Sequence, residues 1–317
     1  MASDVSGTGP CRAFIGMRFS TTIPRMSLLR TGSVLLCLFL IAGVFAPEAN
    51  GQQPAAAPAA SGARMLLLPR RIVSGERATL AVLDVNGRLT PGVTVSFSNG
   101  DRFTTDATGR AMFVAPLNPG VIFGSIAGRT GRVATVVLTP GEAASAAIEV
   151  SAAPRVASLA DRFEILGKGF CGDADANKVT IAGQAAIVLA SSPTALVVLP
   201  PPDLQGGSAA VEVSCAKRQP PPFSIVLIGL ELQADASPLK PGEHRALAVR
   251  VRGTSAKIEL EARNLAPEIA ELTGGNPVRA GSSGGAENSA KFEVVGRKNG
   301  SFLISIRLVP SLGRPQP

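Results

Sequence analysis

Three oxygen-bearing side chains alternate along one short stretch of the chain and could bind calcium. They are Asp173, Asp175 and Asn177, in the sequence GKGFCGDADANKVTIAGQ. An EF-hand loop that begins at Asp173 needs glycine at its sixth position and a bidentate glutamate at its twelfth. Lys178 and Gln184 stand at those positions, so an ammonium group would repel the ion and the strongest ligand is missing. We expect a turn without a tight calcium site; a weak site of another type on the two aspartates is the alternative.

The single histidine is the other candidate for chemistry. His244 lies in KPGEHRAL, and as a catalytic base it would need a nucleophile and an orienting partner. One histidine with few thiols cannot supply the nitrogen and sulfur ligands of an ordinary zinc site. No carboxylate pair lies in an apolar setting that would raise one pKa. The glycine pairs at 206–207, 274–275 and 284–285 lack the helix or lysine of a phosphate loop. We therefore expect no catalytic, cofactor-binding or metal-binding residue and no enzyme.

The composition favours many short strands. Gly 34 and Pro 25 are spread at intervals over 317 residues, as the turns between strands require. The aromatic content of 4% is all phenylalanine, and the absence of Trp and Tyr counts against a lectin-like or antibody-like binding face. The net charge of +8 is dispersed along the chain, whereas nucleic-acid sites concentrate cations beside aromatic residues. We expect no nucleic-acid partner.

The N-terminal region carries the features of an export signal. Arg30 precedes the uncharged, largely apolar residues 34–46, a run too short to cross the ~30 Å hydrocarbon layer comfortably as a helix. Small residues at 49–51 suit cleavage by a signal peptidase. We predict a signal peptide with a signal helix over residues 1–51, with Met26 as the true start. An uncleaved membrane anchor is the alternative, and would be the protein's only contact with a membrane.

Residues 52–64 are a Pro/Ala linker, and the segment after it alternates with a period of two. The ordered set LDVNGRLTPGVTVSF … TTDATGRAMF resembles bacterial Ig-like domains of the invasin/intimin type. The matching residues are Asp84, Gly87, Pro91, Gly92, Val93, Thr105, Asp106, Gly109 and Ala111. The resemblance assigns a bacterial Ig-like domain to residues 65–140. It implies that the motif residues form turns and that the domain is a rod-like spacer on a cell surface.

Residues 153–229 resemble an IPT/TIG domain, which is an Ig-like sandwich. The residues that carry this resemblance are Gly167-x-Gly169-Phe170, Asn177-x-Val179-x-Ile181-x-Gly183, Ser192-x-Thr194-x-Leu196, Pro200 to Pro202, Gly206-Gly207 and Val211-x-Val213. The resemblance places residues 173–177 in the loop between the first strands, where short polar side chains bond back to the backbone.

Residues 230–310 repeat the alternation without a family that we can name. In KIELEARN, Ile258 and Leu260 would face inward while Glu259 faces water. We predict a third Ig-like sandwich here. The fold class is therefore all-β, with three tandem immunoglobulin-like β-sandwiches after the N-terminal signal helix.

Export also decides the state of the four cysteines. Cys11 and Cys37 leave with the signal, and Cys171 and Cys215 remain in a compartment that permits disulfides. Cys215 continues the alternation of two inward valines, and Cys171 follows Phe170 at the junction of a strand and a loop. We predict that the two approach one end of the sandwich and form a disulfide.

These features predict an exported, non-catalytic scaffold or adhesion protein in the periplasm, on the cell surface or outside the cell. Its partner would be a protein or another component of the envelope. An accessory carbohydrate-binding protein of a polysaccharide-acting system is the alternative, because IPT/TIG-like domains also occur in polysaccharide-acting enzymes. DNA binding of the transcription-factor type is a third possibility, disfavoured by the signal and by the lack of a basic recognition loop.

The junctions between the units differ in composition. Residues 139–154 are small and polar, which predicts a flexible first junction and little contact between units. IVLIGLEL, residues 225–232, passes from the second unit into the third without a spacer. We expect a stiffer second junction there.

Overall fold

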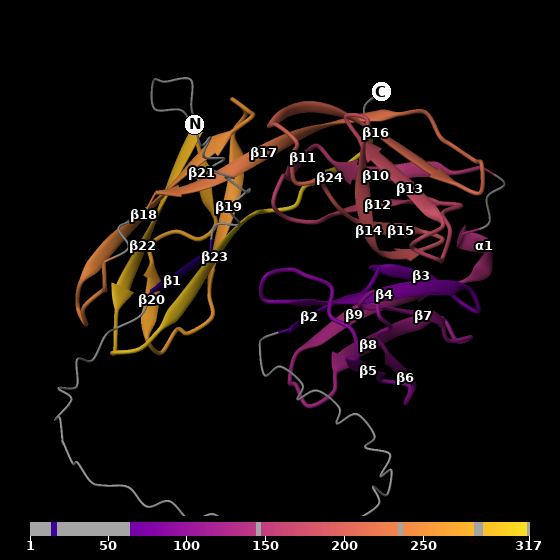
Figure 1. The fold of residues 1–317 in the computed structure, drawn as a ribbon, viewed down its shortest axis with the longest axis horizontal. Helices are drawn as coiled ribbons and strands as arrows, with labels where there is room; N and C mark the ends of the chain where they lie inside the picture. Colours follow the sequence, from indigo (N-terminus) through magenta and orange to yellow (C-terminus); the bar gives the residue numbers. More distant parts are fainter. Residues whose placement is uncertain (1–13, 18–63, 144–146, 234–236, 282–287, 316–317) are drawn as a thin grey trace, which may run out of the picture. The chain divides into compact units, whose positions relative to one another are not determined.

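The computed structural model describes residues 14–17, 64–143, 147–233, 237–281 and 288–315 (Figure 1). Strands dominate these residues, and the one helix among them is the short α1 (Pro140–Ala143). The all-β, immunoglobulin-like fold is thereby confirmed. The predicted signal peptide and Pro/Ala linker lie outside the described residues, apart from β1 (Phe14–Met17) and Arg64. None of the helices described could cross a membrane, judged by length and apolar character.

The first sandwich, residues 64–138, has two sheets. One sheet is β2 (Arg64–Leu67), β4 (Arg77–Asp84) and β7 (Arg110–Val114), with β4 in the middle. The other, in spatial order, is β3 (Arg71–Val73), β9 (Arg132–Leu138), β8 (Gly120–Ile126), β5 (Thr94–Phe97) and β6 (Arg102–Thr104). Apolar side chains from both sheets fill the space between them, and the rings of Phe97 and Phe113 lie with centroids 5.1 Å apart.

The turns of the first sandwich lie at the motif residues of the sequence. One carboxylate oxygen of Asp106 accepts hydrogen bonds from the backbone amides of Thr108 and Arg110. One carboxylate oxygen of Asp84 likewise accepts hydrogen bonds from the backbone amides of Asn86 and Arg88. Gly109 has φ +76°, and a Cβ there would lie 2.6 Å from the backbone nitrogen of Thr90. The turn therefore requires glycine at this position.

The second sandwich, residues 147–228, contains the IPT/TIG-like segment. Its strands are β10 (Glu149–Pro154), β11 (Val156–Ser158), β12 (Phe163–Lys168), β13 (Asn177–Ile181), β14 (Gln184–Ser192), β15 (Ala195–Leu199), β16 (Gly207–Cys215) and the first half of β17 (Phe223–Gln233). β14 pairs with β13 through its first residues and with β15 through the rest, so it belongs to both layers. Ile148, ahead of the predicted start at 153, already belongs to the buried cluster of this sandwich.

The third sandwich continues from the second half of β17. One sheet holds β17, β18 (His244–Arg252), β22 (Asn288–Gly296) and β20 (Ala270–Thr273). The other holds β1, β23 (Phe302–Leu308), β19 (Ile258–Asn264) and β21 (Val278–Ala280). Ile258 and Leu260 are buried between the sheets, as their alternation predicts. The last strand, β24 (Leu312–Gly313), pairs with β10 of the second sandwich.

The second junction is one uninterrupted strand. Residues 223–227 of β17 pair with β16 of the second sandwich, and residues 229–233 pair with β18 of the third. Figure 1 traces β17 along both groups of strands. The expectation that the second unit runs directly into the third is therefore met.

The first junction differs from the expectation, and the prediction of little contact between units is wrong. Three apolar side chains of the first sandwich share a buried cluster with three of the second. They are Leu67, Ala81 and Leu83, and Leu189, Ala190 and Val197. Hydrogen bonds also cross the junction, and Ser191 pairs with Thr79 as a strand neighbour. The composition of residues 139–154 describes the connecting segment, whereas the contact is made by strands on either side of it.

Candidate functional site

The Asp173–Asn177 loop is a turn held by its own asparagine. The side-chain amide of Asn177 donates to the carbonyls of Cys171 and Asp173, and its oxygen accepts from the amide of Cys171. Asp173 accepts a hydrogen bond from the amide of Asp175. The carboxylate of Asp175 pairs with Arg110 of the first sandwich at 2.9 Å. These oxygens therefore close a turn and join two sandwiches, and they do not converge on one point.

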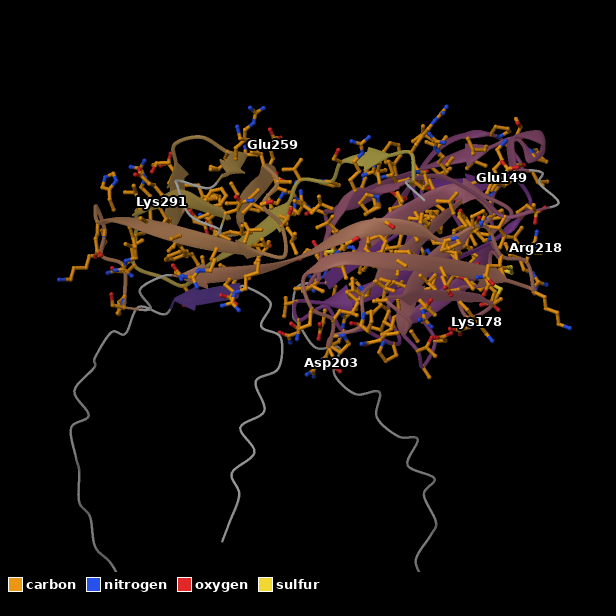
Figure 2. All side chains as sticks on the ribbon, turned by 90° about the horizontal axis from the view of Figure 1, so that it is seen from above. Glu149, Lys178, Asp203, Arg218, Glu259 and Lys291 are labelled. Carbon is orange, nitrogen blue, oxygen red and sulfur yellow. A yellow bond between two sulfur atoms is a disulfide. The ribbon has the colours of Figure 1, made fainter. Side chains whose placement is uncertain are left out.

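The structure joins Cys171 and Cys215 in a disulfide, with 5.9 Å between their Cα atoms. Cys215 is the last residue of β16 and is buried, and it lies opposite Asn177 in the antiparallel pairing of β16 with β13. The bridge therefore fastens the start of the Asp173–Asn177 loop to the strand beside its end. Figure 2 shows all the described side chains, with the bridge drawn as a yellow bond.

His244 lies at the exposed first position of β18, opposite Val295 of β22. Within the described part of the chain its side chain has no hydrogen-bond or ion-pair partner that would orient it. No group of three or more histidine, cysteine or acidic residues gathers there as a metal site would require. Gly206 precedes β16 and Gly207 is its first residue, the pair 274–275 lies between β20 and β21, and 284–285 lies outside the described residues.

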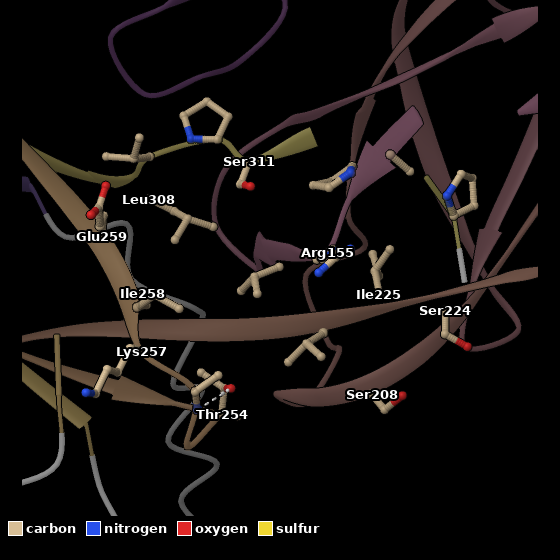
Figure 3. Close-up of a pocket in the computed structure, with 18 of the residues that line it drawn as sticks. Arg155, Ser208, Ser224, Ile225, Thr254, Lys257, Ile258, Glu259, Leu308 and Ser311 are labelled. Atoms are coloured by element: carbon tan, nitrogen blue, oxygen red, sulfur yellow. Dashed lines mark hydrogen bonds between the residues drawn. The ribbon is translucent and has the colours of Figure 1, made fainter. Parts of the chain in front are cut away.

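An open groove of about 910 Å³ lies beside β17. Its lining comes from the second sandwich (Ala153 to Val156, Ser208, Ser224 to Val226), the third sandwich (Thr254, Ala256 to Glu259, Arg279) and the C-terminal segment (Leu308 to Ser311, Arg314, Pro315). We call this hollow the junction groove. Figure 3 shows Arg155, Ile225, Ile258 and Leu308 in this hollow, with Lys257 at its edge next to Ile258.

The charge of the junction groove is strongly one-sided. Arg155, Lys257, Arg279 and Arg314 line it, and Glu259 is the one acidic residue of the lining. Glu259 is already paired with Arg279, whose Nε lies 2.9 Å from its Oε1. Within the described residues, the other three cations form no ion pair. The groove therefore keeps a net positive charge.

Backbone pairing fixes where Arg155 lies. It follows β10 and precedes β11, and its carbonyl accepts a hydrogen bond from the amide of Val226 on β17. Its side chain lies along β24, where a Cβ on Gly313 would be 3.2 Å from its Nε. The strand that returns from the third sandwich to the second thus forms one wall of the groove.

One carboxylate at the first junction is electrostatically unusual. Glu164 of β12 is mostly buried. It accepts a hydrogen bond from the backbone amide of Arg70 in the first sandwich and forms an ion pair with the guanidinium of Arg70 at 2.9 Å. Burial raises the pKa of Glu164 above its usual range, and the contacts with Arg70 oppose that rise only in part. Because the carboxylate pairs with a cation of the first sandwich, it contributes to the first junction.

Comparison with known protein families and with curated proteins gives no match. Among solved structures, the Bacteroides ovatus mixed-linkage glucan utilization protein SGBP-B, solved with a mixed-linkage heptasaccharide, is 13% identical. That alignment covers 75% of this chain and 73% of SGBP-B with a TM-score of 0.29. Domains 4 and 5 of the S-layer protein SbsC are 19% identical over 38% of this chain and 67% of theirs, with a TM-score of 0.20. The Yersinia pseudotuberculosis adhesin InvE is 14% identical over 52% of this chain and 58% of its own, with a TM-score of 0.18.

At these scores the likenesses carry no argument about a ligand or a role. The assignment of the fold rests on the strands and buried clusters themselves.

Nothing in the sequence indicated that the residues of the junction groove lie together. Arg155, Lys257 and Arg314 stand far apart along the chain, each without a neighbouring cation. Only the pairing of β10 with β24 and of β11 with β17 brings them to one hollow. A dispersed charge pattern thus becomes concentrated at one place on the surface.

Proposed function

We propose that the protein is an exported, non-catalytic scaffold or adhesion module of the cell envelope. Its parts are an invasin/intimin-type domain at 65–140, an IPT/TIG domain at 153–229 and a third Ig-like sandwich at 230–310. The observation that carries the proposal is how these units are joined, through one buried interface and one shared strand. Such junctions restrict rotation between modules, which a spacer that holds a partner at a distance requires.

Export is supported by the disulfide. Disulfides persist in oxidising compartments and are rare where glutathione and thioredoxin keep thiols reduced. Cys171 and Cys215 are bonded and one of them is buried, which suits a structural bridge. The partner is a protein or another envelope component, and it would bind at loops or at an exposed strand edge.

Cell fractionation with thiol labelling tests the proposal. The full chain carrying a C-terminal tag should be recovered from the envelope or the medium. Its two remaining thiols should react with a maleimide reagent only after reduction. Recovery from the cytoplasm with both thiols free would rule out the exported scaffold.

The alternative function, accessory carbohydrate binding, can be distinguished from the scaffold by a test for sugar binding. Sites for neutral sugars generally rely on aromatic side chains, and this chain has neither Trp nor Tyr. Specific binding of neutral oligosaccharides to the purified protein would favour this alternative over the scaffold. Failure to bind them, together with capture of an envelope partner by crosslinking in cells, would support the scaffold.

A further inference from the structure

We propose that the junction groove is a binding site for an acidic polysaccharide, recognised through its carboxylate groups. The site involves Arg155, Lys257 and Arg314, with hydroxyl groups from both sandwiches around them. This goes beyond the scaffold function, which needs no ligand in the groove.

The groove gathers positive charge in one place. Some arginines elsewhere in the same two sandwiches pair with acids: Arg252 lies 2.9 Å from Glu231, and Arg307 lies 2.7 Å from Glu261. In the groove, three cations share one hollow without an acidic partner among the described residues. Concave surfaces focus such a field and raise the local concentration of anions. The groove is therefore matched to a ligand that brings negative charge.

Arg155 contributes more than charge. A guanidinium offers a planar fork of donors that fits a carboxylate through two parallel hydrogen bonds. Lys257 and Arg314 are exposed and long enough to reach further anionic groups along the same hollow. Cations spread over a groove of about 910 Å³ suit a chain with repeated carboxylates better than a single small ion.

Hydroxyl groups around the cations favour a sugar over a peptide. Ser208, Ser224 and Ser311 line the groove, and their hydroxyls have no partner within the described residues. A hydroxyl can both donate and accept, so it can match the hydroxyls of a saccharide at variable angles. Apolar surface from Val156, Val226 and Leu308, which are partly exposed, offers contact to the ring faces.

The absence of Trp and Tyr favours an acidic sugar over a neutral one as the ligand. Without an aromatic platform, a neutral oligosaccharide would gain little beyond weak hydrogen bonds. A carboxylated one gains charge-assisted hydrogen bonds, which are about twice as strong. Binding should therefore depend steeply on salt.

Isothermal titration of the purified full chain with an oligogalacturonate tests the inference. We expect binding that weakens several-fold between about 50 mM and about 200 mM salt. The methyl-esterified oligogalacturonate has the same backbone without the charges and should not bind. An oligoglutamate of similar length is the test for an acidic peptide and should bind more weakly.

Arg155→Gln and Lys257→Gln should each weaken binding about fivefold, and the double variant more than about tenfold. Lys178→Gln and Lys291→Gln remove exposed cations outside the groove (Figure 2) and should leave binding unchanged. All four positions are exposed, so each variant should fold, which circular dichroism would verify.

Four results would overturn the inference: no binding, equal binding of the methyl ester, stronger binding of oligoglutamate, or equal losses from the groove and control variants. None of these bears on export or on the scaffold.

Discussion

The two junctions of this protein join their units by different physical means. At the first junction, strands of two sandwiches lie against each other and bury apolar side chains from both. At the second, one strand belongs to two sheets in turn, and the covalent backbone itself is the connection. The first junction therefore depends on the packing of side chains from two sandwiches. The second depends on the continuous backbone of β17 and on its pairing with β16 and β18.

Small polar side chains make the first junction specific. The hydroxyl of Thr79 donates to the carbonyl of Gly172 at 2.8 Å, and Ser191 donates to the same carbonyl at 2.7 Å. The hydroxyl of Ser192 donates to the carbonyl of Arg71 at 2.6 Å. These groups are buried, and each has a partner, so the interface satisfies polar groups that burial would otherwise penalise. The composition of a connecting segment is therefore a poor guide to how tightly two domains are held.

Removing the disulfide should have the largest effect. Cys171→Ser with Cys215→Ser opens a loop of 44 positions, and we expect a loss of about 4 kcal/mol in the free energy of unfolding. Because the bridge anchors the loop that contacts Thr79, the loss should fall on the first junction as well as on the second sandwich. Urea denaturation checks this, with the reduced wild-type protein as the matched control. A loss below about 1 kcal/mol would show that the bridge constrains little.

Leucines on the two sides of the first junction should be energetically coupled. Leu83→Ala and Leu189→Ala each leave a cavity in the shared cluster, and each should cost about 3 kcal/mol. Combined, they should depart from additivity by about 0.5 kcal/mol or more, measured as a double-mutant cycle in urea. Leu260→Ala lies in the core of the third sandwich and should add to Leu83→Ala without coupling. Additivity of the first pair would mean that the two faces do not pack together.

A methyl group added at each of the two junctions should affect stability differently. A Cβ on Gly172 would lie 2.0 Å from the backbone oxygen of Arg77, so Gly172→Ala should cost about 2 kcal/mol. A Cβ on Gly229, in the middle of β17, would meet nothing closer than 3.9 Å. Gly229→Ala should therefore change thermal stability by less than about 0.5 kcal/mol. Equal losses at both positions would contradict the contrast between a packed junction and a continuous strand.

The smallest effect concerns pH. Because burial raises the pKa of Glu164 above its usual 4.5, its contribution to stability is full below that value and is lost as pH rises through the folded pKa. Glu164→Gln should remove this decline from a plot of unfolding free energy against pH. Glu261 is the opposite control, since its hydrogen bond from Arg307 lowers its pKa and its contribution is lost as pH falls. Parallel curves for Glu164→Gln and the wild type would show that Glu164 is not strained by burial.

Features that depend on near neighbours in the chain could be predicted from the sequence. Alternation with a period of two places Ile258 and Leu260 inward, because successive side chains of a strand point to opposite faces. Asp106 and Gly109 define their turn, since the carboxylate bonds to amides a few residues on and glycine tolerates a positive φ. The shared strand β17 could likewise be predicted, because nothing in IVLIGLEL interrupts a strand.

The sequence also carries one sign of the first junction. The continuous apolar run of β4, interrupted only by Thr79, is buried on both faces, and β15 has a similar run in ALVVL. A strand of a sandwich with one wet face should alternate, so such runs indicate that a second layer covers it. The runs reveal that both faces are buried, but not what buries them.

Only the tertiary structure decided which distant residues meet. Arg70 and Glu164 are separated by 94 positions, and the cations of the junction groove come from three parts of the chain. The partner of each such group depends on how whole sheets pack, and that packing is set by shape and burial summed over many side chains. The local pattern of residues therefore predicts the strands, their buried faces and their turns. The first junction and the junction groove form only when the sandwiches are in contact.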